Sequence, residues 1–358
     1  MTRNHNFSAG PAVLPESVLL EAREALWDYQ GSGIGIMECS HRTKLYEAVV
    51  QSARDRIRRL MKLTDDQEVL FLQGGASTQF YMVPANLLRG GRAAYIETGH
   101  WAEKAIAEGK RYGTVDVVWS GKSTGFDRVP KPSEWSVQKD TRYLHYTSNN
   151  TIYGTQFTEV LDSPVPLICD ASSDVMSKPI EGSKFDLYYA GAQKNLGPSG
   201  VTVVVIRKSL FEQCDPDLPT MMRYKVHADN ESMYNTPNTW GIYFLERVCA
   251  WIEGQGGLTS IEAANQRRAR ALYAEIDRTG FWRGMCERGS RSVMNVTFTS
   301  GNADWDTTFH TEATKHGLVG LKGHRIAGGL RASLYNAQTD AAVAALVAEM
   351  QEFERTHG

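Results

Sequence analysis

The chain has 358 residues, of which 42% are hydrophobic and 22% charged, and its formal net charge is −2 at neutral pH. This composition is typical of a folded protein with one large core and a smaller domain. The balanced charge gives no global attraction to nucleic acid or to a membrane, and no apolar run is long enough to span a bilayer. The first residues lack the apolar core of a signal peptide, and the five cysteines form no CxxC pair. We therefore expect a cytoplasmic protein with reduced thiols and no metal site.

The N-terminal part predicts two helices joined by a glycine-rich segment. Pro15 and Glu16 mark the start of a helix over 17–29, and apolar residues at helical spacing predict an amphipathic helix over 43–63. The glycines at 31–35 follow no strand and have the wrong spacing for a dinucleotide-binding turn. His41 and Arg42 precede the second helix, whose N-terminus attracts anions. On position alone, a solvated pair is an equally good interpretation.

A glycine turn between a strand and a helix is the first candidate binding element. The strand covers 68–72, the turn contains Gly74, Gly75, Ala76 and Ser77, and the helix covers 79–88. Backbone N–H groups in such a turn can bind a phosphate. The turn lacks the GK[ST] signature of a nucleotide loop, which favours a monophosphate.

Further strands alternate with helices or crossovers and predict a doubly wound α/β sheet. Trp101 follows one of these strands, where it could stack on a flat ring or belong to the core. A predicted helix at 102–112 comes next. The seven predicted strands are 68–72, 93–97, 115–119, 143–146, 165–169, 187–190 and 201–206.

Asp170 and Lys194 are the strongest candidate catalytic residues. Asp170 ends the strand over 165–169, and Lys194 lies in the turn between the last two strands of the sheet. Strand ends are where α/β sheets build their sites, and burial lowers the pKa of a lysine toward that of a nucleophile. Pyridoxal phosphate chemistry has two requirements: a carboxylate that pairs with the pyridinium nitrogen and a lysine that forms a Schiff base.

The C-terminal part predicts a small α+β domain. Helices are expected over 240–253, 258–279, 308–316 and 341–356, with strands over 292–299 and 330–335. The glycines at 254–257 are the best boundary in the chain. We expect an N-terminal segment at 1–16, a large cofactor-binding domain at 17–255 and a small domain at 256–358.

A series of motifs resembles the phosphoserine aminotransferases, a class V group of the fold-type I pyridoxal phosphate enzymes, and it extends over essentially the whole chain. In order, the motifs are FSAGPAVLP at 7–15, SHR at 40–42, LQGGAST at 72–78, NNTIYGT at 149–155, CDASSD at 169–174, YAGAQKNLGPSG at 189–200, YNTP at 234–237 and GHRIAGGLRASLYNA at 323–337. The resemblance implies amino transfer between glutamate and 3-phosphohydroxypyruvate in serine biosynthesis. Use of the related substrate of pyridoxine biosynthesis is left open.

The resemblance also implies a role for each matching position. Lys194 would bind the cofactor covalently and shuttle a proton, and Asp170 would hold the pyridine nitrogen. The other implied cofactor ligands are Trp101 on the ring face, Thr151 at the ring hydroxyl, Ala76, Ser77 and Gln193 at the phosphate, and Asn235 and Thr236 from the partner in a homodimer. The implied substrate ligands are His41, Arg42, His324 and Arg325 for the phosphate and Arg331 for the α-carboxylate. Two positions depart from the family pattern: Asn150 stands where many members have Glu, and Ala76–Ser77 where others have Gly-Arg.

Three alternatives are kept beside this interpretation. A class V aminotransferase for an unphosphorylated keto acid would not need the paired cations at 41–42 and 324–325. A cysteine desulfurase would need a reactive thiol, and the candidate, Cys286, has no evident activating cation. A non-catalytic binding protein would not need both Lys194 and Asp170.

Overall fold

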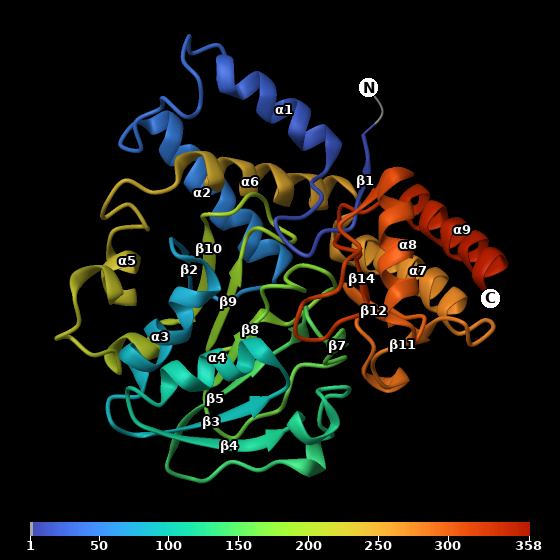
Figure 1. Ribbon diagram of the computed structural model, residues 1–358. Helices are drawn as coiled ribbons and strands as arrows, with labels where there is room; N and C mark the ends of the chain where they lie inside the picture. Colours follow the sequence, from blue (N-terminus) through green and yellow to red (C-terminus); the bar gives the residue numbers. More distant parts are fainter. Residues whose placement is uncertain (1–2) are drawn as a thin grey trace.

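The computed structural model describes residues 3–358 and is built on one large sheet. Its seven strands lie in the order β2-β10-β9-β8-β5-β3-β4 (Figure 1). β10 is antiparallel to both of its neighbours, and the other four pairs are parallel. The strands are β2 (Gln67–Leu72), β3 (Arg92–Glu97), β4 (Thr114–Ser120), β5 (Thr141–Thr147), β8 (Leu167–Asp170), β9 (Leu187–Gly191) and β10 (Thr202–Arg207). The predicted α/β class and all seven strands are confirmed, with small shifts at the ends.

Alternating apolar side chains give the sheet two buried faces, each covered by helices. One face contributes Val69, Phe71 and Tyr146 to a core with α1, α2 and α6. The other contributes Leu70, Leu72 and Tyr189 to a core with α3, α4 and α5. These helices are α1 (Glu16–Trp27), α2 (Lys44–Leu60), α3 (Gly75–Leu87), α4 (His100–Gly109), α5 (Tyr224–Asp229) and α6 (Thr239–Gly254).

Among the helices that begin earlier than the sequence predicts, α3 and α4 lie near the candidate site. α3 begins at Gly75 rather than at 79, because Gly74 and Gly75 have φ of 92° and 68° and turn the chain directly into the helix. A Cβ on Gly74 would lie 1.8 Å from Thr78 Oγ1, so the turn requires glycine. α4 begins at His100 rather than at 102, which puts Trp101 in its first turn.

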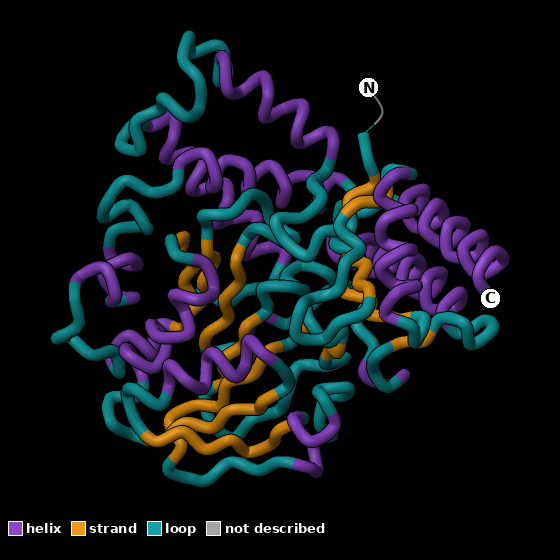
Figure 2. The backbone as a smooth tube through the Cα atoms, in the orientation of Figure 1, coloured by secondary structure: helices purple, strands orange, loops and turns teal. Residues whose placement is uncertain are grey.

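The C-terminal part is built on a smaller antiparallel sheet with its own core. Its strands are β11 (Arg283–Gly284), β12 (Asn295–Thr299) and β14 (Leu330–Ser333), and its helices are α7 (Gly257–Ile276), α8 (Ala303–Lys315) and α9 (Asp340–His357). α8 begins five residues before the predicted start, where Asn302 caps it by accepting hydrogen bonds from two backbone N–H groups. Figure 2 shows the smaller sheet to the right of the large one, with loops between them.

Two segments connect the cores. The N-terminal strand β1 (His5–Asn6) pairs with β13 (Leu318–Val319), and Phe7 is fully buried in the C-terminal core. α7 contributes Leu258 and Ile261 to the large core and its later residues to the smaller one. The domain limits at 16 and 255 therefore stay predictions.

Two short strands, β6 (Asn149–Asn150) and β7 (Thr155–Gln156), form a hairpin beyond β5. In the described part of the chain, no helix has the length and apolar character needed to cross a membrane.

Candidate active site

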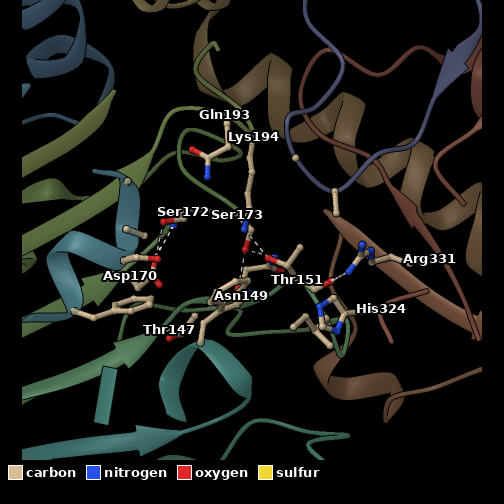
Figure 3. A pocket seen from close by; sticks show the side chains of 18 of the residues that line it. Thr147, Asn149, Thr151, Asp170, Ser172, Ser173, Gln193, Lys194, His324 and Arg331 are labelled. Atoms are coloured by element: carbon tan, nitrogen blue, oxygen red, sulfur yellow. Dashed lines mark hydrogen bonds between the residues drawn. The ribbon is translucent and has the colours of Figure 1, made fainter. Parts of the chain in front are cut away.

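A cavity of about 410 Å³ lies where the carboxyl ends of β5, β8 and β9 face the smaller sheet. The N-terminus of α3, the start of α4, the segment around Gly10 and the strand β14 complete its walls. Figure 3 shows Lys194 reaching into this cavity, with Asp170 on one side and Arg331 and His324 on the other. The structure thus brings residues from distant parts of the chain together at the topological position where α/β sheets bind ligands.

The amine of Lys194 is positioned by Thr151. Lys194 follows β9 in the turn toward β10, and its Nζ donates a hydrogen bond of 2.7 Å to Thr151 Oγ1. Burial lowers the pKa of Lys194 to about 8, the negative charge of Asp170 opposes this shift, and the positive charge of Arg331 adds to it. A useful fraction of the amine is therefore neutral near neutral pH, as a nucleophile or a proton acceptor must be.

Asp170 is held in the floor of the cavity by Ser172. The carboxylate is 3% exposed, and its Oδ1 accepts hydrogen bonds from Ser172 N at 3.0 Å and from Ser172 Oγ at 2.7 Å. Burial raises the pKa of Asp170, while the Ser172 hydrogen bonds and the charge of Lys194 lower it. Ser172 Oγ in turn accepts from Gly191 N, which ties the side-chain position to β9.

The N-terminus of α3 offers backbone donors to the cavity. Ala76 and Ser77 lie in the first turn of the helix, and no side chain among residues 3–358 caps that turn. Its first N–H groups and the positive end of the helix dipole are therefore available to an anion. Gln193 lines the same cavity from the turn that carries Lys194.

Trp101 and Arg331 contribute the aromatic and cationic walls. Trp101 lines the cavity from α4, and its indole Nε1 is buried without a partner among the described residues. Arg331 Nη1 donates to the main-chain oxygen of Thr151 at 3.2 Å, and its buried Nε has no partner in that part of the chain. His324 lines the cavity next to it; burial and then the charge of Arg331 lower the pKa of its imidazole.

Five of the predicted site residues lie outside the cavity: His41, Arg42, Asn235, Thr236 and Arg325. All are exposed except His41, which is half-buried with a buried, unpaired Nε2 within the described residues. Asn235 lines a second cavity of about 290 Å³ that shares Gly74 with the first, and the Thr236 main-chain oxygen accepts a hydrogen bond from Gln73 Nε2 at 3.4 Å. The assigned roles of these five residues stay predictions.

Asn150, one of the two departures from the family pattern, does not line the cavity. Its side chain is 1% exposed, accepts a hydrogen bond from Thr98 Oγ1 at 3.2 Å and donates one to Thr155 Oγ1 at 3.1 Å. It holds the β6–β7 hairpin in place. Ala76 and Ser77, the other departure, present only an apolar and a hydroxyl side chain where others have arginine.

The sequence reasoning missed several residues that the structure places in the cavity wall. Thr147, Asn149 and Ser172 line it, as does Gly10 from the N-terminal segment. A Cβ on Gly10 would lie 3.3 Å from Lys194 Cγ, so this close approach favours glycine. The signal for Gly10 was present in the turn-rich FSAGPAVLP stretch. Thr147 directly follows the predicted strand 143–146, and Ser172 comes two residues after Asp170.

The residues of this cavity fit pyridoxal phosphate. The set comprises a lysine amine of lowered pKa, a buried carboxylate across the cavity, an uncapped helix N-terminus and a tryptophan with an unpaired indole N–H. Each matches one part of the cofactor: the aldehyde, the ring nitrogen, the phosphate and the ring face. Residues 3–358 contain no group of three or more His, Cys, Asp or Glu side chains that could hold a metal ion.

Comparison with known proteins identifies the class. The family model for class-V aminotransferases matches residues 4–346, and the chain belongs to this family. Phosphoserine aminotransferases are among its similar relatives: the Geobacillus kaustophilus protein is 49% identical over 99% of both chains, and the Nitrosomonas europaea protein is 47% identical over the full length of both.

Solved structures agree with this assignment. The phosphoserine aminotransferase of Bacillus circulans subsp. alkalophilus superimposes with a TM-score of 0.98 at 47% identity, over 99% of each chain. The PLP-bound phosphoserine aminotransferase of Trichomonas vaginalis gives a TM-score of 0.93 at 37% identity, over 98% of this chain and all of that one.

Proposed function

We propose that this protein is a pyridoxal phosphate-dependent aminotransferase that transfers an amino group reversibly between glutamate and 3-phosphohydroxypyruvate, giving O-phospho-L-serine and 2-oxoglutarate. The observation that carries the proposal is the placement of the Lys194 amine in one cavity with Asp170 and Arg331. Full-length identity of nearly one half to phosphoserine aminotransferases supports the substrate.

The cofactor supplies an electron sink for negative charge at the substrate α-carbon. Around it, each cavity residue has a physical task. Lys194 Nζ would hold the cofactor and, as a neutral amine, would accept the proton from the substrate α-carbon. Asp170 would hold a proton on the ring nitrogen; burial raises the pKa of its carboxyl, and the Ser172 hydrogen bonds and the charge of Lys194 act against that shift. The Thr151 hydroxyl directs the Lys194 amine, and the α3 N-terminus with Gln193 would bind the cofactor phosphate.

Arg331 is suited to the α-carboxylate of the substrate. Its guanidinium is held by the Thr151 main-chain oxygen at one nitrogen and has a buried, unpaired Nε within the described residues. Arginine can bind a carboxylate with two parallel hydrogen bonds. For the substrate phosphate we propose His41, Arg42, His324 and Arg325.

A homodimer would complete the site, with Asn235 and Thr236 reaching the cofactor of the neighbouring chain. Both side chains are exposed, and Asn235 lines the second cavity, which shares Gly74 with the main cavity. Large apolar side chains that a partner would cover support this assembly: Trp27 is 87% exposed and Met37 is 59% exposed. We place the enzyme in the cytoplasm and in serine biosynthesis.

The desulfurase alternative is disfavoured by the environment of Cys286. The residue is 7% exposed and does not line the cavity, and its thiol donates to the Gly154 main-chain oxygen. Burial raises the pKa of the thiol to about 11, which is the opposite of what a nucleophilic cysteine needs.

A substrate panel tests the proposed function. With glutamate as amino donor, purified protein loaded with pyridoxal phosphate should aminate 3-phosphohydroxypyruvate and give far lower kcat/KM for hydroxypyruvate and pyruvate. The visible absorbance of the loaded protein should bleach on addition of glutamate. Equal kcat/KM for phosphorylated and unphosphorylated keto acids would replace the proposal with a general class V aminotransferase.

A further inference from the structure

Thr147 and Asp170 face the cavity side by side. Thr147 is the last residue of β5, Asp170 is the last residue of β8, and the two are direct partners in the parallel register. Both line the cavity, and Figure 3 shows them on the same side of it, away from Arg331 and His324. Asp170 already has a role at the cofactor nitrogen, whereas Thr147 has none.

The hydroxyl of Thr147 is buried without a partner. Its side chain is 3% exposed, and Oγ1 has no hydrogen bond to any residue in 3–358. Of the next two residues back on the same face of β5, Tyr143 OH pairs with Tyr95 OH at 2.9 Å. His145 Nε2 pairs with Tyr189 OH at 2.9 Å, while His145 Nδ1 has no partner within 3–358. A buried hydroxyl without a partner is costly, so a group that enters the cavity is the natural partner of Thr147.

The hydrogen bonds of Asp170 point to the same part of the cavity. Both bonds from Ser172 go to Asp170 Oδ1, and Oδ2 accepts none from residues 3–358. The neighbouring strands thus end on a carboxylate oxygen and a hydroxyl that both lack a partner within 3–358. Trp101 can fix the plane of a ring by stacking, but it cannot fix the position of the ring within that plane. Two adjacent polar groups at one edge of the ring can do so.

We propose that Thr147 is a cofactor-binding residue whose hydroxyl binds pyridoxal phosphate at the ring edge beside Asp170. The inference rests on the proposed cofactor and adds a residue to its site. Thr147 and Asp170 together set the lateral position of the ring above the ends of β5 and β8.

Cofactor binding to the cofactor-free protein tests the proposal with a matched control. Thr147→Val removes the hydroxyl and keeps the shape, and Thr147→Ser keeps the hydroxyl. Thr141→Val is the control, because Thr141 begins β5 on the same face, is 6% exposed and also has an unpartnered buried Oγ1 within 3–358, but does not line the cavity. Each protein, stripped of cofactor, is titrated with pyridoxal phosphate and followed by quenching of tryptophan fluorescence.

Thr147→Val should weaken binding roughly two- to tenfold, the usual value of one net hydrogen bond. Thr147→Ser and Thr141→Val should stay within about twofold of the parent. Parent-like affinity in Thr147→Val, or an equal loss in Thr147→Ser, would overturn the proposal. If Thr147→Val does not fold, Thr147→Ala compared with Thr147→Ser decides by the same criterion. Failure of the parent to bind pyridoxal phosphate would instead remove the proposed function, so the two failures are distinguishable.

Discussion

The Lys194 amine and the Thr151 hydroxyl lie 2.7 Å apart, and Thr151 also accepts a hydrogen bond from Arg331 at its main-chain oxygen. One residue therefore connects the group that would bind the cofactor with the group that would bind the substrate carboxylate. Asn150, the neighbour of Thr151 in the β6–β7 hairpin, is hydrogen-bonded to Thr98 and Thr155, which explains how a short loop keeps both contacts in place.

The lowered pKa of Lys194 predicts how cofactor attachment depends on pH. Because the pKa is about 8 rather than 10.5, the neutral, reactive amine should increase as the pH rises through 8 and level off above it. The rate at which pyridoxal phosphate attaches to cofactor-free protein, followed by absorbance in stopped flow, should show this midpoint. In Asp170→Asn the opposing charge is lost, and the midpoint should move to lower pH. A midpoint near 10 in the parent would contradict the buried setting of the amine.

Lys194→Ala should abolish transamination and leave the fold intact. The covalent attachment and the proton transfer both depend on Nζ, and loss of general acid–base catalysis alone costs roughly 10²- to 10⁴-fold. Turnover with glutamate and circular dichroism of the same sample measure the two effects. Activity above a trace in a correctly folded variant would show that another group carries these steps.

Asp170→Asn should keep cofactor binding but slow turnover by roughly a hundredfold or more, comparable to the loss of a general acid–base group. The amide fits the same space beside Ser172 but cannot stabilise a proton on the ring nitrogen. Single-turnover reaction with glutamate, followed by the loss of visible absorbance, isolates the affected steps. A rate within a few fold of the parent would mean that a different group serves the nitrogen.

Shared sites in a homodimer predict complementation between two inactive variants. One chain carries Lys194→Ala, and the other carries Asn235→Ala with Thr236→Ala. Each mixed dimer would contain one site with both lesions and one with neither, so activity should return to part of the parent value after subunit exchange. Mass spectrometry of differently tagged chains verifies the exchange. Verified mixed dimers without activity would count against composite sites.

Different arginines are assigned to the phosphate and to the carboxylate of the substrate. Substituting them should therefore have separable effects on substrate choice. Arg42→Ala with Arg325→Ala should reduce kcat/KM for 3-phosphohydroxypyruvate far more than for an unphosphorylated keto acid, by roughly ten- to a hundredfold for each lost contact of about 1.5–3 kcal/mol. Arg331→Ala should damage both substrates together, because both carry the carboxylate. Lysine should rescue position 42 better than 331, since carboxylate binding gains from the planar guanidinium. Equal losses for both substrates in the double variant would show that these residues do not recognise the phosphate.

The large sheet and its central residues were predictable because their signals are local. β-branched and apolar runs mark β9 and β10, and small polar residues mark the turn that places Lys194 between them. The ends of β5 and β8 can be predicted in the same way, because each apolar run is followed by polar residues. These features need no knowledge of distant contacts.

The remainder of the site depends on contacts that sequence spacing does not reveal. The FSAGPAVLP stretch marks Gly10 as part of a turn, but it does not indicate that Gly10 lies against Lys194, which is 184 positions away. The two-glycine start of α3 depends on φ values that a propensity argument does not supply. The open hydroxyl of Thr147 becomes apparent only when the hydrogen bonds of its neighbours are known.

The pairing of β1 with β13 makes the N-terminal segment a strap across the molecule. On one side of Gly10, residues 5–6 are hydrogen-bonded to the C-terminal part, and the Ala9 main-chain oxygen accepts a bond from Tyr335 OH. On the other side, Ala12 N donates to the Gln193 main-chain oxygen, next to Lys194. Any hinge motion that widens the gap between the two sheets must therefore stretch this strap or release one of its anchors. Opening of the cavity and the position of the backbone above Lys194 are mechanically coupled.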